Sequence, residues 1–360
     1  MMNDNSTETI TDPIHDSPFM RACRREQTPY TPVWLMRQAG RYMSEYREVR
    51  ERVSFLELCK NPDLAAEVTV YAAHRLNVDA AIIFADILLI TEPLGLDLEF
   101  AKGDGPKIHN PVRTPADVNR VHHLEDVSSL DYVYEAIRRT RAALREDLPL
   151  IGFCGAPFTV ASYIIEGGSS RNYIHTKRLM YTDAGAWHAL MERVAHASVL
   201  YLNRQIEAGA NAVQLFDSWV GCLSAEDYRT YVQPHSAYII KHVTPGVPVL
   251  HFGTGTATIL EDMRDAGGDV IGLDWRIDFA DGWRRIGYDR AVQGNLDPVA
   301  LFAEPDFIIN QARKILIAAE NRPGHIFNLG HGILPETPVD NVLRLVEAVH
   351  EISARAEAER

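Results

Sequence analysis

The sequence predicts an α/β fold, a single (β/α)8 or TIM barrel, and three observations support this prediction. Eight short apolar runs recur along the 360 residues, each bounded by Gly, Pro or Asp and followed by helical periodicity. The runs at Ala80–Phe84 and Val247–Leu250 are apolar without alternation, which is typical of strands covered on both faces. No linker rich in Pro, Gly or Ser divides the chain. Eight βα repeats in one chain favour a closed barrel.

The expected elements alternate along the chain. The strands are Val33–Met36, Asp79–Phe84, Leu148–Phe153, Asn211–Phe216, Val247–Phe252, Asp269–Leu273, Ala291–Gly294 and Ile326–Leu329. The helices between them include Pro62–Arg75, Val133–Arg145, Ala184–Ala208, Ala225–Lys241, Pro305–Glu320 and Val339–Glu357. An open, doubly wound sheet is the alternative, because periodicity does not show whether a sheet closes.

The chain is longer than the ~250 residues typical of this barrel, so it must contain insertions. The candidates are an N-terminal extension of 30 residues and a βα-loop insertion at Glu92–Leu130, where Gly103–Pro106 predicts a turn. We expect a disordered N-terminal tail over residues 1–17 and one catalytic barrel domain over residues 18–360.

Charge and composition argue against several classes of protein. The chain has 49 acidic and 36 basic residues, a net charge of −13, so a basic surface for nucleic acid or for an anionic membrane is not expected. The four cysteines form no CxxC pair, and neither a disulfide framework nor a zinc site is predicted. The first 17 residues lack the basic start and apolar core of a secretory signal, and no apolar run approaches 18 residues. We therefore expect a cytoplasmic protein without a transmembrane helix.

A positively charged segment stands out against this background. Arg21–Arg52 contains eight Arg, no Lys and four Glu. Within it, Arg37 and Arg41 flank Gln38, Ala39 and Gly40 directly after the first apolar run. Two guanidinium groups beside free backbone N–H groups would suit several carboxylates or phosphates. The arginines further along, Arg47, Arg50 and Arg52, are expected to pair instead with neighbouring glutamates on a helix.

Two further polar residues follow apolar runs. Asp86 ends the most apolar run of the chain, where an ionised carboxylate needs a cation or N–H groups facing it. It is equally suited to capping the next segment or to catalysis. His331 lies between two glycines after the last run, so its ring is unshielded; the alternative is a histidine that only holds a loop. In a barrel, all these positions lie at the catalytic, C-terminal face.

Other chemistries find less support in the sequence. Gly253-Thr-Gly-Thr256 is followed by no Walker lysine, so a loop-to-helix turn is expected rather than a phosphate loop. Cys154 at a strand end is expected to be a buried free cysteine rather than a nucleophile. The histidines show no ligand spacing, and no metal site is predicted.

Long motifs in the chain resemble those of the uroporphyrinogen decarboxylase family. The first runs from Pro32 to Met43 and on through Glu45–Arg47, and the second from Gly152 to Gly168. Further similar stretches are Ala80–Leu88, Gln214–Trp219, Gln293–Pro298 and Asn328–Ile333. The motifs occur in the order of the family and cover the chain from about residue 18 to 350.

The resemblance implies a (β/α)8 barrel, commonly a homodimer, that converts uroporphyrinogen III to coproporphyrinogen III in haem and tetrapyrrole biosynthesis. Four acetate side chains lose CO2 in turn, and no metal or organic cofactor takes part. The resemblance implies Asp86 and Arg37 as the catalytic residues. It implies that substrate is bound by Arg37, Gln38, Ala39, Gly40, Arg41, Asp86, Tyr163, Ser218 and His331.

Two residues depart from the family pattern, and two alternatives remain open. Ala85 stands where the family usually has Ser, and Ser44 where Pro is common; both changes affect loop geometry and remove no charge. A related barrel family transfers methyl groups with zinc, but Cys154 and Cys222 have no His-x-Cys partner here. A non-catalytic tetrapyrrole carrier would bind the same substrate without releasing CO2.

Overall fold

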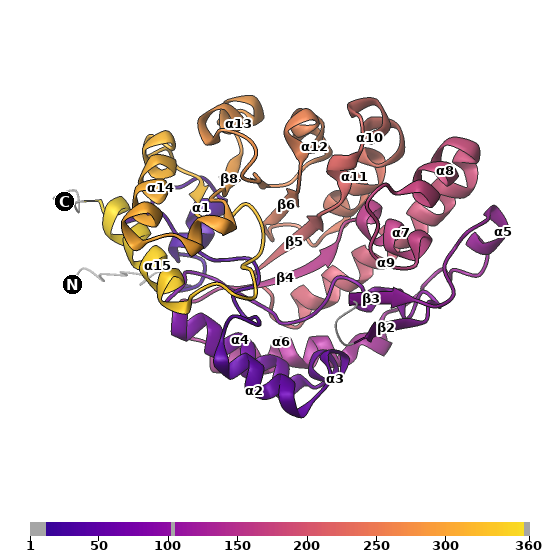
Figure 1. Cartoon of the computed structure of the whole chain (residues 1–360), viewed down its shortest axis with the longest axis horizontal. Coiled ribbons are helices and arrows are strands. Elements are labelled where there is room, and N and C mark those ends of the chain that lie inside the picture. The colour runs from indigo at the N-terminus through magenta and orange to yellow at the C-terminus, as the bar shows by residue number, and fades with distance from the viewer. Residues whose placement is uncertain (1–11, 102–104, 356–360) are drawn as a thin grey trace, which may run out of the picture.

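A parallel sheet lies at the centre of the molecule with helices around it (Figure 1). The computed structural model describes residues 12–101 and 105–355. Within them the sheet has the strand order β1-β4-β5-β6-β7-β8-β9, and all neighbouring pairs are parallel. The strands are β1 (Ala81–Ile82), β4 (Leu150–Gly155), β5 (Ala212–Asp217), β6 (Val249–Gly253), β7 (Val270–Gly272), β8 (Ala291–Gln293) and β9 (His325–Ile326). The order follows the chain without the reversal of a doubly wound sheet, so that alternative is wrong.

The segment 33–36 closes the sheet, although it forms no strand of its own. Val33 makes a parallel bridge with Phe327, just after β9, and the Phe327 N–H donates to the Pro32 carbonyl at 2.8 Å. On the other side, the Asp79 N–H donates to the Val33 carbonyl at 2.8 Å. The Asp79 carboxylate accepts the Val33 N–H at 2.7 Å. The segment thus takes the place of an eighth strand between β9 and β1. The barrel prediction is confirmed, but the first expected strand is reduced to a bridge.

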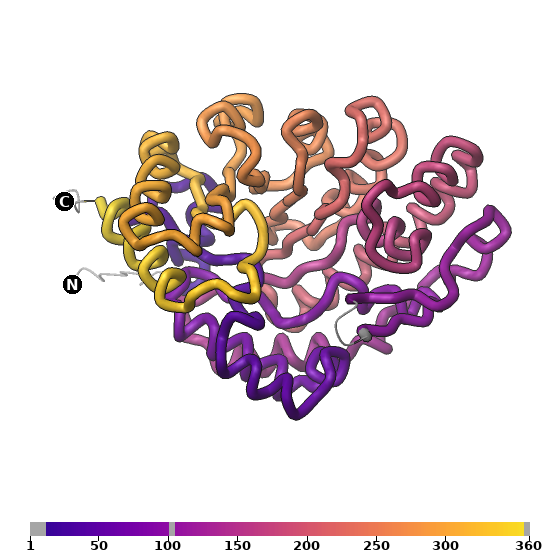
Figure 2. The backbone as a smooth tube through the Cα atoms, viewed as in Figure 1, coloured from indigo at the N-terminus to yellow at the C-terminus, as the bar shows by residue number. Residues whose placement is uncertain are grey.

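The helices surround the sheet (Figures 1 and 2). The α-helices are α1 (Pro18–Cys23), α2 (Ser44–Arg52), α3 (Phe55–Lys60), α4 (Pro62–Leu76), α5 (Pro115–Val118), α6 (Asp131–Ala143), α7 (Pro157–Glu166), α8 (Ile174–Thr182), α9 (Ala184–Glu207), α10 (Ala225–Tyr231), α11 (Gln233–His242), α12 (Leu260–Ala266), α13 (Phe279–Ile286), α14 (Pro305–Ala318) and α15 (Val339–Ser353). Short 3₁₀ turns are η1 (Leu89–Thr91), η2 (Ser128–Leu130), η3 (Val220–Cys222), η4 (Thr256–Thr258) and η5 (Pro298–Phe302). In the described part of the chain, no helix combines the length and apolar character needed to span a bilayer.

Local sequence explains where helix α4 begins and ends. The Asn61 side chain accepts the N–H groups of Asp63 and Leu64, and Pro62 fits the first turn because its missing N–H would have no partner there. The helix ends at Asn77, whose φ of 52° lies in the left-handed region that Asn tolerates. This turn delivers the chain into β1 and so fixes where Asp86 emerges.

One expectation for the elements is wrong, and a second gains detail. The helix expected over Ala225–Lys241 is two helices, α10 and α11, because Pro234 cannot continue a helix and starts a new one. The insertion at Glu92–Leu130 contains an antiparallel hairpin, β2 (Leu98–Ala101) and β3 (Gly105–Ile108). Residues 102–104 of the turn expected there lie outside the described residues.

The N-terminal region is only partly described. Residues 12–17 of the expected disordered tail form a hydrogen-bonded turn, in which the Asp16 N–H donates to the Asp12 carbonyl, and Ser17 caps α1. Residues 1–11 lie outside the described residues. One domain over residues 18–360 stays a prediction.

Candidate active site

The predicted site residues lie at the carboxyl ends of the strands. The loop 37–41 follows the closing segment 33–36, Asp86 follows β1, Ser218 follows β5 and His331 follows β9. Tyr163 lies on α7, the helix that follows β4. This is the face on which barrels of this kind carry their catalytic groups.

Loop 37–41 has a defined shape because Gln38 holds it. The Gln38 N–H donates to the Leu35 carbonyl at 3.0 Å, and Arg37 takes a left-handed φ of 62° within this turn. The Gln38 side chain is buried, donates to the Ala80 carbonyl at 3.3 Å and accepts the Leu35 N–H at 3.2 Å. Gln38 therefore fastens the loop to the start of β1.

Several hydrogen-bond donor groups of loop 37–41 have no partner among the described residues. Arg37 and Arg41 are exposed, and within the described chain their guanidinium groups make no ion pair or hydrogen bond. The backbone N–H groups of Ala39, Gly40 and Arg41 likewise have no partner among the described residues. Two guanidinium groups and three peptide N–H groups are thus available to an anion on one short loop.

Arg47 supports this loop in a way that the sequence did not indicate. Its guanidinium donates to the carbonyls of Arg41 at 2.9 Å and Tyr42 at 3.0 Å, instead of pairing with a glutamate on α2. The Tyr42 hydroxyl in turn donates to the Gln38 carbonyl at 2.7 Å. Arg50 also binds a carbonyl, that of Val53, rather than a glutamate. The expected ion pairs of Arg47 and Arg50 on this helix are therefore wrong.

Asp86 is partly shielded from water and has few partners. Its carboxylate accepts the Leu88 N–H at 2.8 Å. Burial raises the pKa of this carboxyl to about 6, while that N–H and the positive charge of Arg37 lower the pKa and offset part of the burial. Asp86 is thus a carboxylate near neutral pH with acceptor capacity to spare.

The charge of Arg37 also reaches Tyr163 and His331. Burial raises the pKa of the Tyr163 hydroxyl, the Asp86 charge adds to this rise and Arg37 opposes it. Burial, with a smaller contribution from the positive charge of Arg37, lowers the pKa of His331 to about 4. His331 is therefore neutral at pH 7, and its Nδ1 accepts the Gly332 N–H at 2.7 Å, which leaves the ring proton on Nε2. The structure brings Arg37, Asp86, Tyr163 and His331 together.

An aromatic pair borders this group, and sequence reasoning missed half of it. The Tyr163 ring stacks on Trp219 with centroids 3.8 Å apart. Ser218 is half-buried beside Trp219 at the end of β5. The position of Trp219 after an apolar strand could have marked it as a candidate, but its contact with α7 depends on the fold.

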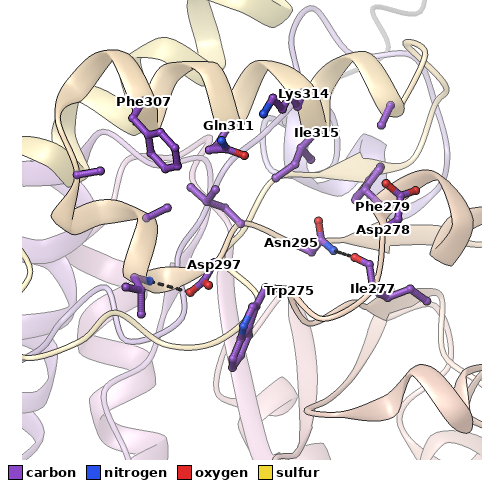
Figure 3. Close-up of a pocket in the computed structure, with 15 residues that line it drawn as sticks. Trp275, Ile277, Asp278, Phe279, Asn295, Asp297, Phe307, Gln311, Lys314 and Ile315 are labelled. Atoms are coloured by element: carbon purple, nitrogen blue, oxygen red, sulfur yellow. Dashed lines mark hydrogen bonds between the residues drawn. The ribbon is translucent and has the colours of Figure 1, made fainter.

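A separate cavity lies beside the site, between η5, α14 and the segments after β7 and β8 (Figure 3). Its volume is about 560 Å³, and Phe307, Gln311 and Lys314 line it from α14. Trp275 lines the cavity and also packs edge-on against His331, with ring centroids 6.5 Å apart. None of the predicted site residues lines this cavity.

Among residues 12–101 and 105–355, no group of three His, Cys, Asp or Glu side chains is placed to hold a metal ion. The zinc-dependent methyl-transfer alternative requires such a group near the strand ends. The described residues therefore offer that alternative no ligand set.

Comparison with known proteins decides the family. Residues 15–352 match the family model of uroporphyrinogen decarboxylase (URO-D). The chain belongs to the uroporphyrinogen decarboxylase family. Among its relatives, the uroporphyrinogen decarboxylase of Carboxydothermus hydrogenoformans is 58% identical over 93% of this chain and 96% of its own length. That of Sorangium cellulosum is 56% identical over 94% of this chain and 97% of its own. The chain is thus an enzyme of the uroporphyrinogen decarboxylase family, a carboxy-lyase of porphyrin biosynthesis.

More distant solved structures share only the fold. A methyltransferase from Methanosarcina mazei has a TM-score of 0.80 at 21% identity, covering 93% of this chain and 98% of its own. A B12-independent methionine synthase from Shewanella sp. W3-18-1 has a TM-score of 0.58 at 11% identity, covering 84% and 90%. Uroporphyrinogen decarboxylases and these proteins therefore share a barrel architecture, and the family assignment rests on sequence.

Proposed function

We propose that this enzyme removes CO2 in turn from the four acetate side chains of uroporphyrinogen III to give coproporphyrinogen III, with Asp86 and Arg37 as its catalytic residues. The observation that carries the residue assignment is the position of the half-shielded Asp86 carboxylate within the field of Arg37. The family membership supports the reaction.

The chemistry of the substrate fits the two parts of this site. Uroporphyrinogen has eight carboxylates around four pyrrole N–H groups, so it needs cations at its rim and an acceptor at its centre. Arg37, Arg41 and the free N–H groups of residues 39–41 suit the rim. Asp86 suits the centre, because its carboxylate can accept several N–H groups at once. Gln38 contributes by holding this loop in place.

Loss of CO2 from an acetate arm requires an electron sink. Protonation of the pyrrole ring carbon supplies one, because the positive charge spreads over the ring. The C–C electron pair then neutralises this charge as CO2 leaves, which gives an exocyclic methylene. Addition of a proton to the methylene and loss of the proton from the ring carbon give the methyl group and restore the pyrrole. The ionised Asp86 carboxylate would stabilise that cation as it develops in a site partly shielded from water.

The roles of the remaining side chains follow from their protonation. Arg37 is a poor acid, since the pKa of a guanidinium lies above ~12. We therefore assign it to carboxylate binding and to the electrostatics of Asp86. Tyr163 and neutral His331 each carry a proton that can be donated in a hydrogen bond to a carboxylate. Ser218 offers a hydroxyl from the end of β5.

Incubation with uroporphyrinogen III under anaerobic, reducing conditions tests the function. Oxidation and chromatography should show porphyrins with seven, six, five and four carboxylates in sequence. Asp86→Asn should keep the fold and lose much of the rate, and near-normal turnover by this variant would remove Asp86 from the mechanism. Binding of uroporphyrinogen without release of CO2 by the wild type would favour the carrier alternative instead.

We also propose a cytoplasmic homodimer, which the family resemblance supports. Sedimentation equilibrium should give about twice the mass of the chain, 40.4 kDa. A mass that stays at one chain across micromolar concentrations would contradict the dimer.

A further inference from the structure

We propose that Asp217 and Thr159 are positioning residues that hold Trp219 against Tyr163, and that this stacked pair fixes where the Tyr163 hydroxyl meets a substrate carboxylate. The second half of this inference rests on the proposed function, whereas the first half concerns the protein alone. Neither Asp217 nor Thr159 faces the substrate, because both side chains are fully buried.

Asp217, Thr159 and the backbone of Trp219 are joined by two hydrogen bonds beneath the site, which we call the relay. The Thr159 hydroxyl donates to Asp217 Oδ1 at 2.7 Å and accepts the Trp219 N–H at 3.2 Å. A hydroxyl has one hydrogen, and the hydrogen bond to Asp217 Oδ1 uses it. The lone pairs of the hydroxyl are then left for the Trp219 N–H. The carboxyl thus sets the direction of the hydrogen bond that holds the backbone of Trp219.

The relay ends at Trp219, whose indole stacks on the Tyr163 ring. Thr159 and Tyr163 are four residues apart on α7, so they lie on one face of the helix. One turn of helix therefore carries both the hydroxyl that binds the Trp219 backbone and the ring on which the indole stacks at 3.8 Å. Tyr173 also packs edge-on against this indole, with centroids 5.3 Å apart. The indole has little freedom to move while the relay is intact.

The surroundings of Asp217 indicate that this carboxyl does more than bind the Thr159 hydroxyl. Its second oxygen, Oδ2, is buried and has no hydrogen-bond partner among the described residues. Burial raises the pKa of this carboxyl to about 7, against the lowering effect of Thr159. The charge of Asp217 in turn raises the pKa of Tyr228 on α10 and of Cys222 in η3. A buried carboxyl without a cation costs stability, so its presence here favours a role in setting this geometry.

The first test compares three variants on the same helix. Thr159→Val removes both hydrogen bonds at nearly constant volume, and Thr159→Ser keeps them. Ser162→Ala is the matched control, because the Ser162 hydroxyl is also fully buried on α7 but has no hydrogen-bond partner among the described residues. We expect Thr159→Val to lower kcat/KM about tenfold, mainly through KM, because a buried N–H loses its acceptor. Thr159→Ser and Ser162→Ala should stay within about twofold of the wild type.

A double-mutant cycle shows whether the effect passes through Tyr163. In a Tyr163→Phe background, Thr159→Val should cause no further rise in KM, since the hydroxyl that it positions is absent. The same rise in KM in both backgrounds would overturn the inference, as would equal effects of Thr159→Val and Ser162→Ala.

A fluorescence measurement separates this inference from the proposed function. Acrylamide quenching of Trp219, taken as the difference between each protein and its Trp219→Phe counterpart, should increase in Thr159→Val and not in Ser162→Ala. Unchanged quenching in Thr159→Val overturns the relay even if the enzyme releases CO2. Increased quenching together with a wild type that releases no CO2 supports the relay and overturns the proposed function.

Discussion

Asp86 has a carboxylate that is partly withdrawn from water and whose charge is balanced at a distance. Its hydrogen bond comes from the Leu88 N–H, and Arg37 acts on it only through its field, since no ion pair joins the two in the described structure. The ionisation of Asp86 therefore depends on a side chain that we also propose to bind substrate.

The pH dependence of the reaction should reveal this dependence. Ionised Asp86 accepts pyrrole N–H groups more strongly than the neutral acid and stabilises a cation, so kcat/KM should rise with pH and level off above the Asp86 pKa of about 6. Arg37→Gln should move this rising limb of the pH profile to higher pH, because the positive charge that lowers the Asp86 pKa is gone. The measurement is kcat/KM for uroporphyrinogen between pH 5 and about 8.

Arg41→Gln is the control for this shift. Arg41 is not among the groups that alter the Asp86 pKa, so its loss should weaken binding without moving the limb. A limb that shifts equally in both variants, or in neither, would contradict the electrostatic role of Arg37.

At the scale of single residues, the sequence predicts those side chains that follow apolar strands. Arg37, Asp86 and His331 were identified in this way, because parallel strands bring their carboxyl ends to one face. Arg47 was misjudged because its contact with the Arg41 carbonyl depends on how the loop folds back. Trp219 was missed because its partner lies on α7, 56 positions earlier in the chain.

Among the elements, the loop after β9 controls the position of Arg37. A Cβ placed on Gly332 would lie 2.7 Å from Arg37 Cγ and 2.9 Å from Nε, and closer still to Cδ. These are atoms of an exposed, flexible side chain, so the backbone at Gly332 can accept alanine while Arg37 must move.

Gly332→Ala should therefore separate activity from stability. We expect kcat/KM to fall about tenfold, because Arg37 loses its charge-assisted contact with a substrate carboxylate. The melting temperature should change by less than about 3 °C, since the added methyl group meets only the exposed, flexible side chain of Arg37. Steady-state assays and thermal unfolding measured on the same preparation check both.

Gly246→Ala provides a contrast, because Gly246 has open space around it but a φ of 86°. This variant should lose some stability and keep its activity. A Gly332→Ala enzyme with wild-type KM and kcat would show that the position of Arg37 is not set by this loop.

The element boundaries show where periodicity stops being informative. The pattern of Ala225–Lys241 continues across Pro234, although the backbone breaks there, since apolar spacing does not record a missing N–H. The run at Val33–Met36 has the composition of a strand, yet only Val33 bridges, because neighbouring positions turn towards the loop that Gln38 holds.

For the whole molecule, closure of the barrel depends on Asp79. Its carboxylate accepts the Val33 N–H at 2.7 Å, the Tyr30 hydroxyl at 2.9 Å and His350 Nε2 at 2.7 Å. One buried side chain thus joins the closing segment, the chain before it and helix α15 at the start of β1.

Asp79→Ala should lower the free energy of unfolding by roughly 3 kcal/mol, because three donors lose a shared acceptor. Asp269→Ala is the comparison, since Asp269 accepts one strand N–H, that of Val249, in a pair supported by a full ladder. Its cost should be about 1 kcal/mol. Urea unfolding checks both, and equal costs would show that closure does not depend on Asp79.

Stability should also depend on pH through Asp217. Its pKa is about 7 in the folded protein and about 4 in the unfolded chain. Between these values the folded state binds more protons, so this residue makes the protein less stable as pH rises from about 4 to 7.

Asp217→Asn should remove that slope, so the stability of the variant relative to the wild type should increase across this range by up to a few kcal/mol. Asp86→Asn is a useful comparison, because the pKa of Asp86 in the folded protein is about 6, so its effect on stability should stop changing above that pH. Denaturant unfolding at several pH values measures both differences. Parallel curves for wild type and Asp217→Asn would contradict the raised pKa of Asp217.

The architecture of the whole chain was predicted from eight apolar runs, and seven of them are strands of the sheet. The closure could not be derived from pattern, because it rests on Asp79, a single side chain whose acceptors face three separate segments. Net charge was also a poor guide to the site: the total is −13, while the arginines that matter lie on one loop.

The peptide N–H groups of Ala39, Gly40 and Arg41, which have no partner among the described residues, affect how this site responds to mutation. A contact made by a side chain is lost by one substitution, whereas a contact made by main-chain N–H groups depends on the backbone conformation. Exchanging Ala39 for another small residue leaves its donor intact, and only proline, which has no N–H, deletes it. The part of the anion-binding capacity of this loop that comes from its peptide N–H groups therefore depends on the backbone fold and is insensitive to most point mutations.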